Sequence, residues 1–395
     1  MYIRVVDKEI GFFKDKDVLL FGGGSCGLRA LEEFVKVGAR IIAFCDNNRT
    51  LAGGELNGYP IIAPEQLYDY PEACIIITST YEDEIVQQLK EMGLDNYYCI
   101  KLGVLREVLD KKEFSNQILE DDQANRIIAE SLLGAEPFFI GRLGSVELEC
   151  LCHYLYFLNR KENRDMKYPG NVKMMMNVNA GFFPEGDEML DRFSSLYMES
   201  LEEMDMIWSM WFSRYEDQLY RDYCRDKAIA DYDHTVFLHQ HPRPWTEALQ
   251  GKKVLVIHPF EASIRENYKK RKILFGNQSF LPDFELLTLK AVQSAAGNRT
   301  EYSDWFEALN YMKKSMEKID FDIVMIGAGA YGLPLGAYAR RLGKKALHIG
   351  GILQLFFGIR GKAWNKLGVY NEHWTVPREE ETPVGYKQVE AGRYW

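Results

Sequence analysis

The sequence predicts an α/β protein of two domains, each built on a mostly parallel sheet. The chain has 395 residues, which is more than a single hydrophobic core usually organises. Short apolar runs alternate with amphipathic segments in both halves of the chain, the pattern typical of βαβ units. A glycine-rich turn directly follows an apolar run in each half. These observations together favour two Rossmann-like domains, of which the second is the larger.

The first domain is predicted over residues 1–112. Its apolar runs read as strands and its amphipathic segments as helices, in alternation. The expected strands are 18–21, 40–45, 74–78 and 97–100, and the expected helices are 28–37 and 82–92. This order predicts a parallel sheet with helices on both faces.

The second domain is predicted over residues 113–370, after a boundary near 110–116 where polar residues interrupt the apolar rhythm. The expected strands are 137–142, 235–239, 253–258, 322–326 and 345–349, and the expected helical regions are 118–133, 189–226 and 333–342. Residues 371–395 lack such a rhythm and are predicted to form an extended C-terminal tail. The second domain is therefore also expected to be α/β.

Composition narrows the class of protein. A formal net charge of −10 argues against a broad basic face for nucleic acid. The N-terminal residues lack the apolar core of a secretion signal, so none is expected. The longest apolar run, 346–359, is too short to span a bilayer. The seven cysteines form no C-x-x-C pair, so reduced cytosolic thiols and a cytoplasmic location are expected. The sequence leaves open whether the chain forms a homo-oligomer.

The first glycine motif comes between an expected strand and an expected helix. Gly22, Gly24 and Gly27 fit the pattern G-x-G-x-x-G, in which backbone N–H groups approach a diphosphate at the helix N-terminus. Asp46 ends the next strand, where an acidic residue would bond a ribose hydroxyl. The alternative is that this turn only packs the helix against the sheet.

Residues 17–100 resemble the N-terminal domains of sugar-modifying acetyltransferases and related units attached to polysaccharide enzymes. The resemblance rests on the run from Cys45 to Asn48 and on the run from Gly58 to Glu65. It implies that the first domain binds a nucleotide or a nucleotide sugar. Whether that ligand is a nucleotide sugar or NAD stays open.

A second motif lies at the start of the larger domain, in the run from Ile140 to Glu149. Arg142 is expected at the carboxyl end of a strand and Glu147 in the first turn of the next helix. The run resembles the Arg-Phe-Gly-Asp-Gly-Glu motif of D-type glycosyltransferases, whose two acids help to hold a divalent metal on the donor diphosphate. Ser145 stands in place of the aspartate, so only Glu147 carries over as a ligand for Mn²⁺ or Mg²⁺. The alternative is that Glu147 only offsets the helix dipole.

A third glycine turn is expected to line the same donor pocket. Gly327 and Gly329 follow a strand and open a helix, and Tyr331 lies within the turn. The region that follows resembles the C-terminal part of the D-type fold, which assigns His348 to the donor pocket. A packing role is the alternative for this histidine.

A further candidate site lies at the end of the expected strand 253–258. His258 ends this strand and is a candidate ligand-binding residue. Ser263 and Arg265 lie at the start of the next helix and are predicted to bind phosphate oxygens. A solvated basic helix face is the alternative for this segment.

The leading functional hypothesis is a glycosyltransferase of bacterial polysaccharide or glycoconjugate synthesis. The resemblance covers about residues 118–365 and implies a nucleotide-diphosphate sugar as donor and a glycan or glycoconjugate as acceptor. Arg142, Glu147 and His348 are the candidate catalytic residues. One alternative is a non-catalytic nucleotide-sugar sensor or scaffold. Another is an NAD-dependent oxidoreductase that uses His258 or His348 as its acid–base residue.

Overall fold

The computed structural model describes residues 4–5, 11–79, 82–100, 118–157, 167–210 and 214–395. The chain divides into two compact units, the first formed by residues 1–115 with 211–218 and the second by 116–210 with 219–395. The boundary expected near 110–116 lies outside the described residues. Within the described part of the chain, each unit contains one seven-stranded, predominantly parallel sheet, which confirms the predicted α/β class.

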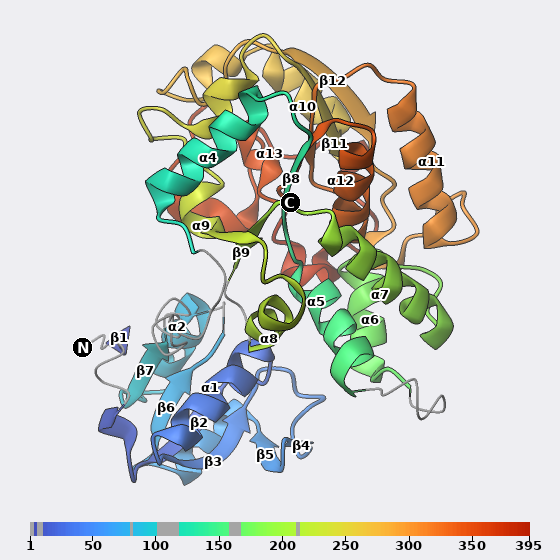
Figure 1. Cartoon of the computed structure of the whole chain (residues 1–395). Coiled ribbons are helices and arrows are strands. Elements are labelled where there is room, and N and C mark those ends of the chain that lie inside the picture. The colour runs from blue at the N-terminus through green and yellow to red at the C-terminus, as the bar shows by residue number, and fades with distance from the viewer. Residues whose placement is uncertain (1–3, 6–10, 80–81, 101–117, 158–166, 211–213) are drawn as a thin grey trace. The chain divides into compact units, whose positions relative to one another are not determined.

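The first unit has the strand order β1-β7-β6-β2-β3-β5-β4 (Figure 1). Neighbouring strands are parallel, except that β4 and β5 are antiparallel. The strands are β1 (Arg4–Val5), β2 (Asp17–Phe21), β3 (Arg40–Cys45), β4 (Glu55–Leu56), β5 (Tyr59–Ile62), β6 (Cys74–Ile77) and β7 (Tyr97–Ile100), and the helices are α1 (Ser25–Lys36), the 3-10 helix Pro64–Asp69 and α2 (Glu82–Glu91).

Alternating residues of these strands face two separate hydrophobic cores. Leu20 of β2 packs in the core that contains Phe34 of α1, whereas its neighbour Leu19 packs in the core that contains Leu89 of α2. Because successive side chains of a strand point to opposite faces, α1 and α2 cover opposite faces of the sheet. Burial on both faces explains why β2 and β6 read as continuous apolar runs.

The second unit has the strand order β10-β9-β8-β14-β13-β11-β12, and all neighbouring strands are parallel. The strands are β8 (Phe138–Arg142), β9 (Met206–Ser209), β10 (Ala228–Asp231), β11 (Lys253–His258), β12 (Glu285–Lys290), β13 (Ile323–Ile326) and β14 (Lys345–His348).

The helices of this unit are α4 (Asp121–Leu133), α5 (Ser145–Cys152), which continues as a π-helix over His153–Phe157, α6 (Gly170–Val178), α7 (Asp187–Glu202), α8 (Arg214–Tyr223), α9 (Tyr232–Thr235), α10 (Glu261–Tyr268), α11 (Trp305–Glu317), α12 (Gly332–Arg341) and α13 (Leu353–Phe356). Most of these helices lie between successive strands in the sequence, whereas α4 precedes β8 and α13 follows β14. Single 3-10 turns are Trp245–Leu249, Arg271–Ile273, Ala295–Gly297, Gly329–Tyr331, Lys362–Leu367, Glu379–Glu381, Tyr386–Gln388 and Glu390–Gly392. The first residues of α8, up to Gln218, group with the first unit.

Helices cover both faces of the second sheet (Figure 1). Ile140 of β8 shares a hydrophobic core with Ile128 of α4 and Ile264 of α10, so these helices lie on one face. The neighbouring residue Phe139 points the other way, where a Cβ added to Gly336 of α12 would lie 2.3 Å from its ring. The close approach of α12 therefore depends on this glycine.

Several elements of this unit differ from the prediction. The strands β10 and β12 were not among the expected ones. The region 189–226, expected to be helical, is interrupted by β9, because the apolar run of residues 206–209 is buried between β8 and β10. Residues 235–239, expected to be a strand, are not one: Thr235 ends α9, and the ring of His239 stacks on Phe237 at 4.7 Å. Val236 and Phe237 of this segment pack in the hydrophobic core of the second unit instead.

The segment 371–395 also differs from the extended tail that was expected. It contains three 3-10 turns and packs against the second unit. Trp374, Glu381 and Val389 are buried there. The predicted tail is therefore part of the fold.

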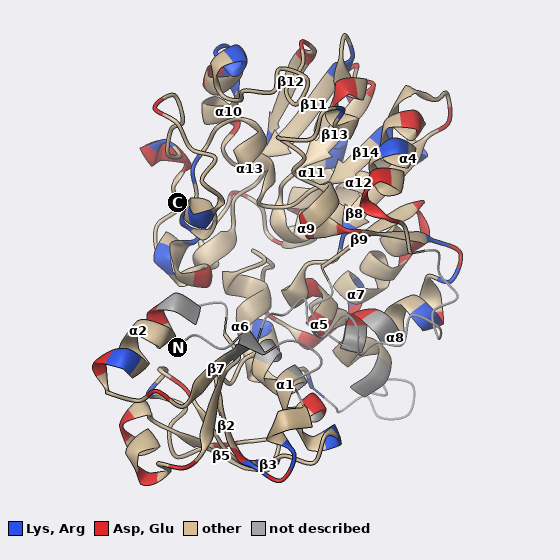
Figure 2. Cartoon of the chain, turned by 90° about the vertical axis from the view of Figure 1, so that its left-hand side faces the viewer, with Lys and Arg blue, Asp and Glu red and all other residues tan. Residues whose placement is uncertain are grey.

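Both signs of charge are interspersed over the surface helices and loops (Figure 2). Among the described residues, we find no helix with the length and apolar character needed to cross a membrane.

Candidate functional site

The strand order of the second sheet indicates where this unit would bind a ligand. The chain leaves β8 through α5 toward β9 on one side, whereas β14, the neighbour of β8 on the other side, is reached from β13. The order therefore reverses between β8 and β14, and open α/β sheets bind ligands at the carboxyl edge of such a position. Arg142 is the last residue of β8, and His348 is the last residue of β14.

Arg142 has an unsatisfied group at this edge. Its Nε atom is buried without a hydrogen-bond partner, and its Nη1 atom donates only to the sulfur of Met210, at 3.6 Å. Among the described residues, no carboxylate forms an ion pair with this guanidinium. Burial alone would lower the pKa of Arg142, but Tyr232 and Glu147 raise it above its usual value. The site therefore holds a buried positive charge without an ion-pair partner among the described residues, and such a charge favours a bound anion.

Gly350, just after β14, makes room for this guanidinium. It adopts a positive φ of 76°, and a Cβ at this position would lie 2.3 Å from Nε of Arg142. Both the backbone conformation and the close approach require glycine here.

Glu147 lies in the first turn of α5, as predicted, but its carboxylate turns back on its own helix. A Cβ added to Gly144, the residue that caps this helix, would lie 2.0 Å from Oε2 of Glu147. The side chain is buried, with 7% of its surface exposed. Burial raises the pKa of Glu147, and the charge of Arg142 and a hydrogen bond from its own backbone N–H oppose this rise. Glu147 therefore offsets the dipole of α5 and carries a carboxyl group that is easier to protonate than usual.

These residues do not fit a divalent cation. Glu147 supplies a single carboxylate, and Ser145, at the position of the motif's aspartate, supplies none. Asp231, the last residue of β10, caps α9 by accepting from the backbone N–H of His234 at 3.0 Å. The described ranges contain no group of three or more His, Cys, Asp or Glu residues that could hold a metal ion.

The two candidate histidines are packed inside the unit. A Cβ at Gly332 would lie 2.0 Å from the ring of His348, and the Nδ1 atom of His348 is buried without a partner. His258 lies beside Gly327 in the same way, and its Nδ1 accepts from the backbone N–H of Phe260 at 2.9 Å. Burial lowers the pKa of each histidine to about 3. Both imidazoles are therefore neutral at pH 7.

The third glycine turn is filled by atoms of the chain itself. A Cβ at Gly327 would lie 2.6 Å from the His258 ring, and one at Gly329 would lie 3.1 Å from the Ala180 carbonyl oxygen. Tyr331 is buried, and its ring stacks on Trp305 at 4.8 Å. These positions serve close packing of α12, the role that glycine commonly has between a strand and a helix.

The expected phosphate clamp on α10 is occupied by a carboxylate from the C-terminal segment. Glu381 accepts hydrogen bonds from the backbone N–H groups of Ala262, at 2.7 Å, and Ser263, at 3.2 Å, and from the Ser263 hydroxyl. Arg265 is 60% exposed and pairs with Glu261 of the same helix at 3.0 Å. Ser263 therefore binds an internal anion, and Arg265 belongs to a solvated helix face.

In the first unit, the strand order reverses between β2 and β6, and the first glycine motif lies at that carboxyl edge. Gly22 has a φ of 122°, and a Cβ at Gly27 would lie 1.9 Å from the Gly22 carbonyl oxygen. Gly24 is exposed and has no atom within 4 Å of its Cβ position. Asp46 braces the loop by accepting from the backbone N–H of Gly23 at 2.8 Å. Gly22 and Gly27 shape the turn, and Gly24 leaves its backbone open to a ligand.

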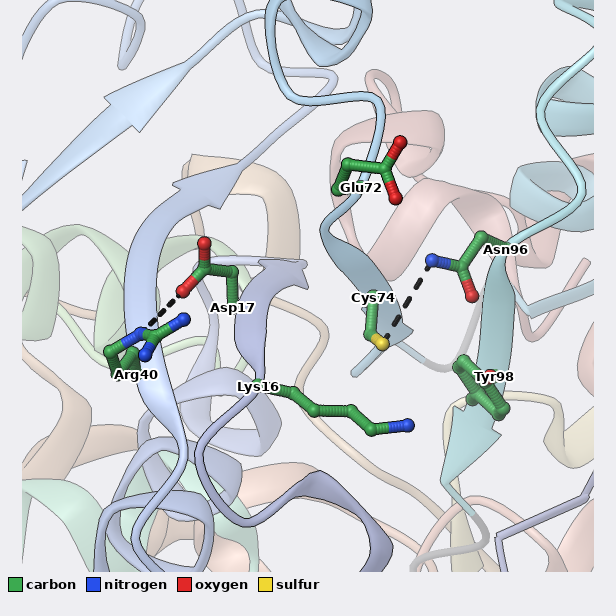
Figure 3. Close-up of a pocket in the computed structure, with 7 residues that line it drawn as sticks. All are labelled: Lys16, Asp17, Arg40, Glu72, Cys74, Asn96 and Tyr98. Carbon is green, nitrogen blue, oxygen red and sulfur yellow. Dashed lines mark hydrogen bonds and ion pairs between the residues drawn. The ribbon is translucent and has the colours of Figure 1, made fainter.

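The first unit also has a pocket of about 330 Å³ at the opposite edge of its sheet (Figure 3). Its lining residues are Lys16, Asp17, Arg40, Glu72, Cys74, Asn96 and Tyr98. Asp17, Arg40 and Cys74 begin their strands, so the pocket lies at the amino ends of the strands, away from the glycine loop.

Sequence reasoning missed the residues that surround Arg142. The pair Gly350–Gly351 directly after a strand is a signal for close backbone approach that the sequence did offer. Tyr394 and Arg393 near the C-terminus gave no such signal, because nothing in the sequence relates them to a residue about 250 positions earlier.

Comparisons with known proteins give three findings. Residues 14–100 match the family model described as C2185-like, N-terminal. No curated protein matches the chain. Solved structures of the domain of unknown function 1792 are similar to parts of it. One, a selenomethionine-substituted structure, has 11% identity and a TM-score of 0.38, and covers 68% of this chain and 93% of its own.

Two further structures of that domain match over a similar share. One is described as having a distinct glycosyltransferase fold, with 12% identity, a TM-score of 0.37 and coverage of 68% of this chain and 93% of its own. The other is described as a new glycosyltransferase from Streptococcus sanguinis, with 11% identity, a TM-score of 0.36 and coverage of 67% of this chain and 96% of its own.

Proposed function

We propose that the second unit is a glycosyltransferase that binds the diphosphate of a nucleotide-sugar donor at the carboxyl edge of β8 and β14. The observation that supports this most strongly is the guanidinium of Arg142, which is partly buried and has no ion-pair partner among the described residues. A guanidinium binds two phosphate oxygens side by side, and its low-polarity surroundings strengthen that attraction.

In this proposal Arg142 stabilises the leaving group. As the bond between the anomeric carbon and the diphosphate oxygen breaks, negative charge accumulates on the diphosphate, and a fixed guanidinium offsets it without rearrangement of solvent. No step passes through a metal ion, because the acids of the site do not fit one. The positive charge for the leaving diphosphate comes from the protein.

Glu147 is the proposed base. The acceptor hydroxyl transfers its proton to the Glu147 carboxylate while its oxygen forms the new bond to the anomeric carbon. Burial raises the pKa of Glu147 toward the range in which a carboxylate is an effective base. The acceptor is a glycan or glycoconjugate, in keeping with the sequence resemblance to enzymes of bacterial polysaccharide synthesis.

Release of nucleoside diphosphate tests the proposal. The full chain is incubated with UDP-, GDP- and ADP-sugars, with and without EDTA, and the product is measured for wild type, Arg142→Gln, Glu147→Gln and the control Glu149→Gln from the same helix. We expect turnover with one donor class, less than about a tenfold change with EDTA, and about a hundredfold loss for Glu147→Gln and Arg142→Gln. Equal rates for wild type and Arg142→Gln would contradict the proposal.

A non-catalytic nucleotide-sugar sensor is the second candidate, and the open position at Gly24 favours it. In that case the first unit binds the ligand and no donor is consumed. Nucleotide binding that is lost in Gly24→Val, together with no turnover of any donor, would support the sensor.

The NAD-dependent oxidoreductase has less support from the geometry. It needs His258 or His348 to exchange protons with a substrate, but burial lowers the pKa of both to about 3 and both rings are packed against glycines. A thermal-shift titration with NAD provides the direct comparison with nucleotide sugars.

A further inference from the structure

We propose that Arg393, in the C-terminal segment, is a second anion-binding residue of the site at Arg142. The inference rests on the proposed function and extends it: the last residues of the chain would complete the diphosphate site and close it on one side. No sequence motif pointed to this segment, and the argument depends on contacts within the second unit.

Two adjacent glycines bring the C-terminal segment to Arg142. Gly350 makes room for the Arg142 guanidinium, and Gly351 makes room for the ring of Tyr394, which would lie 2.3 Å from a Cβ at that position. The two side chains are therefore packed on consecutive residues of one loop. Arg393 precedes Tyr394 and comes to the same edge of the sheet.

Backbone hydrogen bonds fix the position of these residues. The buried side chain of Gln354 donates to the carbonyl oxygen of Tyr394 at 3.0 Å. The backbone N–H of Ala363 donates to the carbonyl oxygen of Arg393 at 2.9 Å. Arg393 is thus held at this edge in the absence of a ligand, which reduces the entropy that binding would cost.

Arg393 keeps donors available for a ligand. Among the described residues it forms an ion pair with Glu390, from Nη1 to Oε2 at 2.6 Å, and its side chain is 42% exposed. A guanidinium has five N–H donors, so this pair leaves others for phosphate oxygens. Tyr394 lies beside the same carboxylate, with its hydroxyl 3.4 Å from Oε1 of Glu390. Glu390 therefore orients Arg393 in the way that a carboxylate commonly orients a binding arginine.

The turn that presents Arg393 is strained. Glu390, Ala391 and Gly392 have φ values of 46°, 55° and 74°, and only the last is a glycine. A residue with a side chain is less favourable than glycine in this left-handed region. Such strain persists where the surroundings enforce it and is commonly found at ligand clamps. It is an independent indication that the conformation of this turn has a function.

Binding of inorganic pyrophosphate to the full chain, measured by calorimetry, tests the inference. Arg393→Gln removes the charge, and Arg378→Gln is the matched control, because Arg378 lies in the same segment and pairs with Glu380 at the surface. We expect Arg393→Gln to weaken pyrophosphate binding by about tenfold or more and Arg378→Gln to change it less than about twofold. Arg393→Lys, which keeps the charge, should fall between wild type and Arg393→Gln.

The outcomes separate the two proposals. If wild type binds no pyrophosphate, or if Arg142→Gln binds it as well as wild type, the proposed site is wrong and this inference with it. If Arg142→Gln loses binding while Arg393→Gln and Arg393→Lys bind like wild type, only the role of Arg393 is wrong. Circular dichroism of each variant shows whether it is folded. If Arg393→Gln is unfolded, the affinity of Arg393→Lys for pyrophosphate still tests the role of Arg393. Non-additive losses in the Arg142→Gln, Arg393→Gln double variant are expected if both residues bind one anion.

Discussion

The Ser263 hydroxyl donates to the carboxylate of Glu381, which lies more than a hundred positions later in the chain and accepts from the backbone at the first turn of α10. The N-terminus of a helix attracts anions, and here the chain supplies its own. The C-terminal segment is therefore fastened to the second unit by a buried charge as well as by apolar packing.

The first prediction follows from that contact. Glu381→Gln removes the charge from a buried carboxylate that accepts several hydrogen bonds, so we expect the free energy of unfolding to fall by about 1.5 to 3 kcal/mol. Glu380→Gln, at the neighbouring exposed position, should change it by less than about 0.5 kcal/mol. Urea denaturation measures both. Equal stability of the two variants would mean that apolar contacts alone hold the segment.

The second prediction concerns the glycine beside Arg142. Gly350 and Gly343 both have positive φ, 76° and 77°. A Cβ added to Gly350 would meet the side chain of Arg142, whereas a Cβ added to Gly343 would meet no atom within 4 Å. Gly350→Ala and Gly343→Ala should therefore lose similar stability from backbone strain, about 1 to 2 kcal/mol. Pyrophosphate binding should weaken about tenfold in Gly350→Ala alone. Unchanged binding would show that the position of the guanidinium does not matter to the ligand.

The third prediction is a pH dependence of stability. Burial lowers the pKa of His258 to about 3, from 6.5 for an unperturbed histidine. Between these values the unfolded chain binds a proton that the folded chain does not, so the folded state loses stability as the pH falls below about 6.5. Above that pH this contribution is constant.

Replacing the histidine tests this directly. His258→Asn should reduce the slope of unfolding free energy against pH, between about pH 4 and 6, by up to about 1.4 kcal/mol per pH unit. A slope that is the same in His258→Asn and wild type would mean that His258 is protonated in the folded protein.

The fourth prediction separates the glycines of the first unit. Gly24 has open space at its Cβ position, whereas a Cβ at Gly27 would lie 1.9 Å from the Gly22 carbonyl oxygen. Gly24→Val should keep the fold and weaken nucleotide binding, and Gly27→Ala should lower the melting temperature. Thermal unfolding with and without nucleotide measures both effects. A Gly24→Val variant that binds nucleotide like wild type would exclude the loop as its binding site.

The sequence predicted those parts of the fold that depend on local pattern. The central residues of β2, β3, β8 and β11 form continuous apolar runs because both faces of each sheet are covered, and these strands were recognised for that reason. β9 was missed because Met206–Ser209 lies between helical stretches, so its apolar residues were assigned to one long helical region. This strand is defined by its neighbours β8 and β10, which a local pattern does not contain.

The site could be predicted only in part for a similar reason. The ends of β8 and β14 follow from the strand pattern, so Arg142 and His348 were placed at their strand ends correctly. The roles of glycines 327, 329 and 332 depend on which side chain fills each missing Cβ, and that is a property of tertiary packing. The contributions of Glu381 and Tyr394 depend on contacts that lie 119 and 40 positions apart in the sequence.

The most direct test of the account is a calorimetric titration of the full chain with a nucleoside diphosphate, UDP first, for wild type and Arg142→Lys. Lysine keeps the positive charge but loses the planar fork that binds two oxygens at once. We predict that UDP binds wild type and that Arg142→Lys binds it about 10 to 100 times more weakly, a difference of roughly 1.4 to 2.8 kcal/mol, with an unchanged melting temperature. Equal affinities in two folded proteins would contradict the assignment of Arg142 to the diphosphate.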